Sequence, residues 1–387
     1  MGDYGSKDKI QLQLPILTNP DETPVLPADH PLNNGGFFTS GPIETLRTQH
    51  AAAEEENYLT TPTLGTHEST GHIRMRDGYP SKIRIFRPSC PSTTGSPLIV
   101  LIFGGGYLVG TNMQHAPFAR ALTALYNATT ITISYRLAPQ YPFPTGAQDV
   151  WDSVSWIAEH ATLLGADPTA GFILGGVSAG GHLTTLTAQR AVSENLQPPL
   201  TGLWISVPVT TLTADGIPER YRDIWTSRTE NANAPILNMA DINFAEEQYK
   251  PDTESDWFNP YAHPQAARGF PKSYFQVVEL DPLRDDGIVF ERYLRDSGVE
   301  TRLDFYRGVP HCHYAFYPEL KASRVFRRDV VVKFGWLLNR EVSEGEIVRV
   351  VGNALMLEEK SKDEGEGEGE GFSLGRFLSG IREYLYV

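Results

Sequence analysis

From Pro97 onward, short continuous apolar runs alternate with longer segments of helix-forming residues. A run that is apolar at every position is typical of a strand buried on both faces, and helices are the usual cover for such strands. The order therefore predicts an α/β protein with a mostly parallel central sheet flanked by helices. We expect strands over 98–103, 129–135, 170–175, 202–207, 274–278 and 301–306, and helices over 115–126, 147–164, 180–192, 285–297 and 321–339.

The chain before this region carries different patterns. Apolar and polar residues alternate over 71–77 and again over 81–87, and Asp77-Gly78 lies at the turn between them, so a β-hairpin is predicted. A helix is expected over 41–56, where proline comes early and strong helix formers follow. Residues 1 to about 40 are rich in Pro, Asn, Asp and Gly, which favours irregular chain.

More than sixty residues separate the strand candidate ending at Val207 from the one beginning at Tyr274. This is too long for a simple crossover, and such an insertion, about 208–270, is typical of a lid or substrate-binding cap. A surface decoration is the alternative, because ornaments also use long loops. The aromatic residues of the insertion suit either an apolar ligand or a small core of their own: Tyr221, Trp225, Tyr249, Trp257 and Phe258.

Charge and composition exclude several classes of protein. The chain has 33 basic and 47 acidic residues and a formal net charge of −14, which argues against a nucleic-acid or anionic-membrane partner. The low-complexity Glu/Gly segment 358–371 predicts a solvated, disordered tether. The longest apolar run, 97–103, is far shorter than the roughly 20 residues of a membrane span.

The cysteine count and the first residues bear on the compartment. Cys90 and Cys312 are too few for a disulfide framework, which favours a reducing environment. Residues 1–9 contain charges but no apolar core of a secretory signal. A cytoplasmic location is therefore expected.

The segment Gly176-Val177-Ser178-Ala179-Gly180 fits the pattern G-x-S-x-G. An apolar strand candidate precedes it and a helix candidate follows, which is the setting in which a serine hydroxyl is exposed on a sharp turn. Ser178 is therefore a candidate nucleophile. The alternative is an ordinary glycine-rich helix start.

A serine nucleophile needs a base, and the base needs a carboxylate that holds its tautomer. Asp281 follows the strand candidate 274–278, and His311 follows the strand candidate 301–306, so both lie at strand ends where open α/β sheets place function. His313 is the rival base, and Asp281 could instead form a turn before Pro282. Asp285 and Asp286 resemble charges at a helix N-terminus.

The three glycines 104–106 close the strand candidate that begins at Leu98. Bare backbone there could offer N–H donors to the oxyanion of a tetrahedral intermediate. A dinucleotide fingerprint beginning at Gly104 would require glycine at position 109, which is Val109. A tight structural turn is the remaining alternative.

Taken together, these motifs resemble the hormone-sensitive-lipase-like branch of the α/β-hydrolases over about residues 71–339. The resemblance rests on the glycine loop, the Ser178 turn and His311, together with Tyr135-Arg136-Leu137-Ala138-Pro139, Tyr141-Pro142-Phe143-Pro144 and Asp281-Pro282-Leu283-Arg284-Asp285. It implies Ser178, Asp281 and His311 as catalytic triad, and backbone N–H groups of Gly105, Gly106 and Ala179 as oxyanion hole.

The resemblance also implies a division of the chain. An N-terminal segment, 1–70, would form a cap together with the insertion 208–270, a hydrolase domain would occupy 71–340, and 341–387 would be an extension. Four residues, at three places in the chain, depart from the family pattern. Phe103 stands where His is usual, Val177 where Asp is common, and Cys312-His313 where Gly and Phe are common. The stretch 311–314 is similar to fungal members associated with secondary metabolism.

The leading expectation is a serine hydrolase that cleaves a carboxylic ester or lactone through an acyl-enzyme and needs neither metal nor organic cofactor. A biosynthetic enzyme that performs cyclisation, condensation or acyl transfer on a polyketide-like intermediate is one alternative. A ligand-binding receptor without catalysis is another. The expected partner is a small apolar ester, lactone or acyl compound, and the expected state is a monomer or homodimer.

Overall fold

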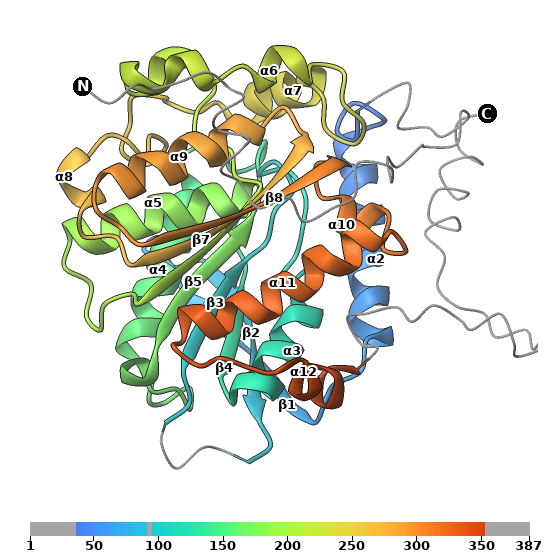
Figure 1. Ribbon diagram of the computed structural model, residues 1–387, viewed down its shortest axis with the longest axis vertical. Coiled ribbons are helices and arrows are strands. Elements are labelled where there is room, and N and C mark those ends of the chain that lie inside the picture. Colours follow the sequence, from blue (N-terminus) through green and yellow to red (C-terminus); the bar gives the residue numbers. More distant parts are fainter. Residues whose placement is uncertain (1–35, 91–94, 353–387) are drawn as a thin grey trace, which may run out of the picture.

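The computed structural model describes residues 36–90 and 95–352, which form an eight-stranded sheet with helices on both faces (Figure 1). The strand order is β1-β2-β4-β3-β5-β6-β7-β8. Strands β3 to β8 run parallel, while β2 is antiparallel to both β1 and β4. The predicted fold class is confirmed. The strands are β1 (Thr66–Arg74), β2 (Pro80–Pro88), β3 (Leu98–Ile102), β4 (Thr129–Ile133), β5 (Phe172–Val177), β6 (Gly202–Ser206), β7 (Lys272–Leu280) and β8 (Thr301–Pro310).

Successive residues of the central strands feed two separate core layers. In β3, Val100 packs into the layer under one set of helices, while its neighbours Ile99 and Leu101 pack into the other. This follows from the two-residue repeat of a strand, and it explains why these strands are apolar at every position. One layer is covered by α4 (Thr145–Glu159), α5 (Ala179–Ser193) and α9 (Arg284–Asp296), the other by α3 (Ala116–Tyr126), α11 (Lys321–Leu337) and α12 (Glu344–Val350) (Figure 1).

Several element boundaries differ from the sequence expectation. The strand expected from residue 170 begins at Phe172, because Pro168–Ala170 forms a 3₁₀ turn capped by the Asp167 carboxylate. The helix expected to reach residue 164 ends at Glu159, and a turn that closes at Gly165 with a φ of 81° follows. Helix α12 was not predicted. The acidic segment 358–371 lies outside the described residues.

The insertion after β6 is held to the core by two buried carboxylates at the start of α9. Asp285 accepts backbone N–H groups of Thr226 and Ser227, at 2.6 and 2.7 Å. Asp286 accepts the N–H of Thr210 at 2.7 Å, the Trp225 indole N–H and the Arg228 guanidinium. Their expected role as helix N-terminal charges is therefore incomplete, because they also anchor the insertion. Its elements are η3 (Ala214–Gly216), η4 (Glu219–Ile224), α6 (Ser227–Glu230), α7 (Met239–Tyr249) and α8 (Pro264–Ala267).

The N-terminal segment is bonded to the insertion through Asp241. Asp241 of α7 accepts the N–H groups of Phe38 at 2.8 Å and Thr39 at 3.0 Å. From there the chain enters α2 (Ile43–Thr60), which runs down the side of the molecule beside α3 and the short helix α10 (His313–Phe316) (Figure 1). No helix among the described residues is both long and apolar enough to span a membrane.

Asp329 of α11 is a buried carboxyl whose titration is expected to affect stability. Burial raises its pKa to about 6, although the Tyr306 hydroxyl donates to it at 2.8 Å. Because this folded-state pKa lies above the ordinary value, the stabilisation is present at low pH and is lost as the pH rises through about 6.

We expect Asp329→Asn, which keeps a hydrogen-bond acceptor for Tyr306 but cannot ionise, to be more stable than wild type near pH 8 by on the order of 1 to 3 kcal/mol. The advantage should shrink towards pH 4, where both side chains are neutral. Urea unfolding of the two proteins across pH 4 to 8 measures this difference. Parallel stability profiles would contradict it.

Candidate active site

Ser178 lies on a tight turn between β5 and α5, in a conformation that side chains rarely adopt. Its φ of 56° and ψ of −121° place the hydroxyl above the carboxyl end of the sheet. The turn depends on two glycines. A Cβ on Gly176 would lie 2.3 Å from the carbonyl oxygen of Gly180, and a Cβ on Gly180 would lie 2.3 Å from that of Ile102. The G-x-S-x-G pattern is thus explained by backbone contact.

Ser178, His311 and Asp281 come together in one hydrogen-bonded chain. The Ser178 Oγ lies 3.0 Å from His311 Nε2, and His311 Nδ1 lies 2.7 Å from Asp281 Oδ2. The three residues come from the carboxyl ends of β5, β7 and β8, which are far apart in sequence but share one edge of the parallel sheet. All three are largely buried, with 8, 5 and 1% of their surface exposed for Ser178, His311 and Asp281.

The donors and acceptors of this chain fix one tautomer of His311. An ionised Asp281 carboxylate can only accept, so His311 Nδ1 carries the proton and Nε2 is left to accept from the Ser178 hydroxyl. Burial lowers the pKa of His311, but the interactions with Asp281 and Cys312 together outweigh it, and the net pKa is well above the ordinary value for histidine. The geometry therefore supports proton transfer from Ser178 to His311.

Asp281 is positioned by groups that the sequence did not reveal. Its Oδ1 accepts the N–H of Leu283 at 2.8 Å. The Asn231 side chain, from the insertion, donates to the carbonyl oxygens of Glu279 and Asp281, both at 2.9 Å. No local motif marks Asn231, because its partners are about fifty positions away.

His313, the rival base, lies elsewhere. Its fully buried ring packs against Tyr306 and Phe326, and burial lowers its pKa to about 3. A ring with that pKa remains neutral at physiological pH and is enclosed by aromatic side chains. The hydrogen bond of Ser178 goes to His311.

The glycine loop lies directly against the Ser178 turn. Gly105 and Gly106 have φ values of 122° and 59°, and a Cβ on Gly105 would lie 2.3 Å from the carbonyl oxygen of Val109. A Cβ on Gly104 would lie 2.6 Å from the carbonyl oxygen of Val177. Within the described part of the chain, the N–H groups of Gly105, Gly106 and Ala179 have no hydrogen-bond acceptor. They are available to an oxyanion.

Phe103 and Val177, the two apolar residues that depart from the family pattern, are both packed among neighbouring side chains. The Phe103 ring stacks on Tyr135 with centroids 4.2 Å apart and planes within 11°, and the Tyr135 hydroxyl donates to the Phe103 carbonyl at 3.1 Å. Val177 is almost fully buried beside Ser178 and lines the cavity described below. The loop is thus supported by an aromatic stack at Phe103, where the family pattern usually has histidine.

Tyr107, the residue after the glycines, joins the loop to the insertion. Its ring stacks on Tyr249 of α7 with centroids 4.0 Å apart. Its hydroxyl lies 2.6 Å from His182 Nδ1, and His182 Nε2 lies 2.7 Å from the Phe258 carbonyl. Because a carbonyl only accepts, Nε2 carries the proton and Tyr107 donates to Nδ1. Burial lowers the pKa of His182 to about 4, so this neutral form persists across the physiological range.

A cavity of about 820 Å³ opens over Ser178 and His311. Its walls come from the glycine loop, α2, the insertion and the segment after β8. The apolar side chains from the insertion that line it are Val209, Leu212, Ile236, Leu237, Ile242, Ala245, Tyr249, Pro251 and Phe258. Of the five aromatic residues noted in the insertion, only Tyr249 and Phe258 line this cavity. The other three have partners elsewhere. Trp225 donates a hydrogen bond to Asp286 and Tyr221 donates one to Asp296, while the Arg190 guanidinium lies over the Trp257 ring.

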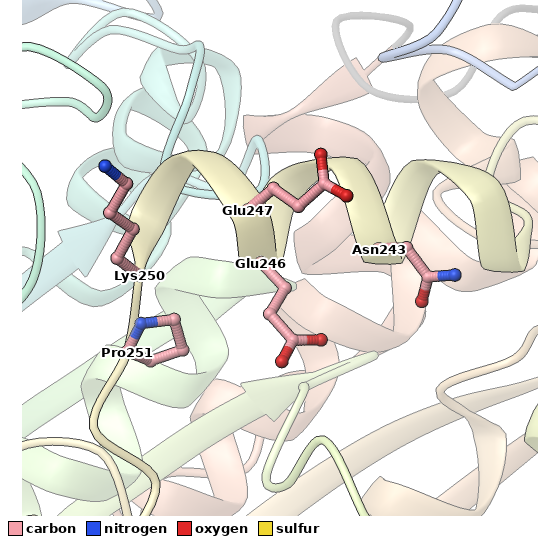
Figure 2. Close-up of a pocket in the computed structure, with 5 residues that line it drawn as sticks. All are labelled: Asn243, Glu246, Glu247, Lys250 and Pro251. Atoms are coloured by element: carbon pink, nitrogen blue, oxygen red, sulfur yellow. The ribbon is translucent and has the colours of Figure 1, made fainter.

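A second hollow, on α7, has a different character. Figure 2 shows Asn243, Glu246, Glu247, Lys250 and Pro251 around it. Four of its five lining residues are polar or charged, and neither Ser178 nor His311 is among them. The described residues also contain no group of three or more His, Cys, Asp or Glu side chains arranged to hold a metal ion.

Comparisons with known proteins agree with this geometry. A family model described as the alpha/beta hydrolase fold matches residues 99–315. An AB hydrolase superfamily protein of Schizosaccharomyces pombe is 34% identical over 274 residues, covering 71% of this chain and 80% of that protein. The carboxylesterase NlhH of Mycobacterium tuberculosis is 35% identical over 308 residues, covering 78% of this chain and 92% of that protein.

Among solved structures, that of vibralactone cyclase superposes with a TM-score of 0.71 at 28% sequence identity. The match covers 77% of this chain and 90% of the cyclase. The similarity therefore includes nearly the whole of the solved chain.

The backbone at Ser178 predicts unequal stabilities for two replacements that both remove the hydroxyl. Ser178→Gly should be more stable than Ser178→Ala by about 1 kcal/mol, because glycine adopts the observed φ and ψ without a clash, and this relief exceeds its extra chain entropy when unfolded. Chemical unfolding of both variants measures the difference. An alanine variant as stable as the glycine variant would show that the turn is not strained.

Proposed function

The chain belongs to the α/β-hydrolase fold family, in its carboxylesterase-like branch, and from this premise we propose that it is a serine hydrolase that cleaves a carboxylic ester or lactone. The observation that carries the proposal is the continuous hydrogen-bonded chain from Ser178 through His311 to Asp281. It ends at a cavity large enough for a small-molecule ester.

In the first half of the proposed reaction, Ser178 Oγ attacks the ester carbonyl carbon while His311 Nε2 takes the hydroxyl proton. The carbonyl oxygen becomes an oxyanion, and we assign its stabilisation to the N–H groups of Gly105, Gly106 and Ala179. The intermediate collapses when the bond to the alcohol oxygen breaks. His311 returns its proton to that oxygen, and the acyl group remains on Ser178.

In the second half, water attacks the acyl carbonyl and loses a proton to His311 Nε2. Collapse of the second intermediate breaks the bond to Ser178, which regains a proton from His311, and the carboxylic acid leaves. Asp281 stays ionised throughout and stabilises the imidazolium that forms twice per turnover. The raised pKa of His311 reflects this stabilisation.

We further propose that residues 36–60 and the insertion act together as the cap of the site. Both contribute side chains to the cavity wall, and Asp241 ties them to each other through Phe38 and Thr39. The mainly apolar wall favours a substrate with an apolar acyl or alcohol portion. The sequence similarity to a carboxylesterase supports the same class.

A second candidate reaction follows from the likeness to vibralactone cyclase. If a hydroxyl of the acyl group itself attacked the acyl-enzyme in place of water, the product would be a lactone and Ser178 would be released in the same way. Both reactions begin with acylation of Ser178. They differ only in the acceptor of the second half, so analysis of the released product distinguishes them. No observation favours the receptor alternative over either of these.

The first test is turnover of p-nitrophenyl esters from acetate to octanoate. Wild-type protein should release p-nitrophenol, and Ser178→Ala should lose at least about 10³-fold in kcat, since it removes the nucleophile. Equal rates in the two proteins would sink the proposal. Ser178→Ala protein purified by the same procedure also controls for contaminating esterases.

The second test concerns the pH dependence of kcat/KM. The rate should fall as the pH drops through the raised pKa of His311, because the protonated ring cannot accept from Ser178. Asp281→Asn removes the largest influence that raises the pKa of His311, while burial continues to lower it, so the acidic limb should move to lower pH and the plateau should fall by about 10³ to 10⁴. Rates measured from pH 5 to 9 report both effects, and an unmoved acidic limb would contradict the assigned roles.

A further inference from the structure

We propose that Glu54 and Gln114 form a positioning pair that sets the placement of the glycine loop beside Ser178. The pair connects α2, in the N-terminal segment, to the backbone of Gly104. This inference rests on the proposed function of Gly105 and Gly106 as oxyanion donors. Neither Glu54 nor Gln114 is assigned a chemical step.

Gln114 holds the loop through the one glycine N–H that is not offered to the substrate. Its Oε1 accepts the N–H of Gly104 at 2.8 Å. Gly104 is packed against the Ser178 turn so closely that a Cβ there would lie 3.2 Å from that of Ser178. Fixing Gly104 therefore fixes the distance between the nucleophile and the two donors that follow in the chain.

Glu54 in turn fixes the orientation of the Gln114 amide. Gln114 Nε2 donates to Glu54 Oε1 at 3.0 Å, and the Thr111 hydroxyl donates to Glu54 Oε2. A carboxylate can only accept, so the amide nitrogen must face Glu54 and the amide oxygen must face Gly104. A flipped amide would bring two donors together at Gly104 and remove the support of the loop.

The burial and neighbours of the pair indicate more than a surface contact. Glu54 is 7% exposed, and Glu54, Gln114 and Gly104 all line the cavity over Ser178. A buried carboxylate is costly unless donors satisfy it, and here Thr111 and Gln114, from the segment that follows the glycine loop, both donate to Glu54. His50 of α2 also lies close, with its Nε2 3.0 Å from Glu54 Oε1. Since the Phe103 side chain has no polar group, it cannot provide this support. Through Gln114, Glu54 of α2 therefore provides a polar anchor at the Gly104 end of the loop.

The test uses Gln114→Ala, Gln114→Glu and the reciprocal double variant Glu54→Gln with Gln114→Glu. Gln114→Glu sets two carboxylates against each other. The double variant restores the pattern, because the carboxylate now at position 114 would accept from the Gly104 N–H and from the amide now at position 54. Glu55→Gln is the matched control, since Glu55 is the exposed neighbour on the same helix.

We expect kcat for a p-nitrophenyl ester to fall about ten- to a hundredfold in Gln114→Ala and Gln114→Glu, with KM within about threefold of wild type, because a displaced oxyanion donor acts in the transition state. The double variant should recover most of the loss, and Glu55→Gln should match wild type. Provided that the variants are folded, a loss confined to KM, or the absence of recovery in the double variant, would overturn the proposal.

Hydrogen exchange of the Gly104 amide separates this proposal from the proposed function. The amide should be protected in wild type and should exchange at least about tenfold faster in Gln114→Ala, whether or not any ester is turned over. If wild type turns over no ester but the Gly104 amide still exchanges faster in Gln114→Ala, the hydrolase assignment is overturned and the anchoring bond is supported. If wild type is active but the Gly104 amide exchanges equally fast in both proteins, only the proposed anchoring bond is overturned.

Discussion

The close approach of two backbones at the Ser178 turn is the constraint on which the site depends. Gly180 can follow the turn only because it has no Cβ, and its neighbour across the gap is the carbonyl of Ile102 at the end of β3. The adjacency of β3 and β5 in the sheet brings this about. As a result, the glycine loop that continues from β3 emerges beside the nucleophile. One strand pairing thus brings the Ser178 hydroxyl close to the N–H groups that we propose as oxyanion donors.

Buried carboxylates hold the surrounding segments over this core. Asp285 and Asp286 bind the insertion, and Asp241 binds the N-terminal segment to it, each through backbone N–H groups. Burial raises the pKa of Asp241 and Asp286, because removing a carboxylate from water is costly. Such groups add little net stability but strongly disfavour arrangements in which their donors are absent. They therefore specify where the segments lie over the cavity.

The sequence predicted what depends on local pattern and missed what depends on distant partners. The parallel strands followed from apolar runs, and the Ser178 turn followed from glycines within two positions of it. Asn231 and Glu54 have no such signature, because their partners lie about fifty and sixty positions away. Asp285 illustrates the boundary between the two cases. Its place at a helix start is local, but its anchoring of the insertion appears only when residues 226 and 227 fold back onto it.

The glycine loop is secured from two sides, and this bears on which reaction the site performs. Gln114 anchors it to α2, and Tyr107 anchors it to the insertion through His182 and Tyr249. A loop fixed in this way serves acylation equally well for hydrolysis and for cyclisation, because both pass through the same first intermediate. The choice between them is made afterwards, by whether water or a substrate hydroxyl reaches the acyl carbonyl. Under the proposed function, the determinants of that choice therefore lie in the wall of the cavity, to which α2, the insertion and the segment after β8 all contribute, and not in Ser178, His311 or Asp281.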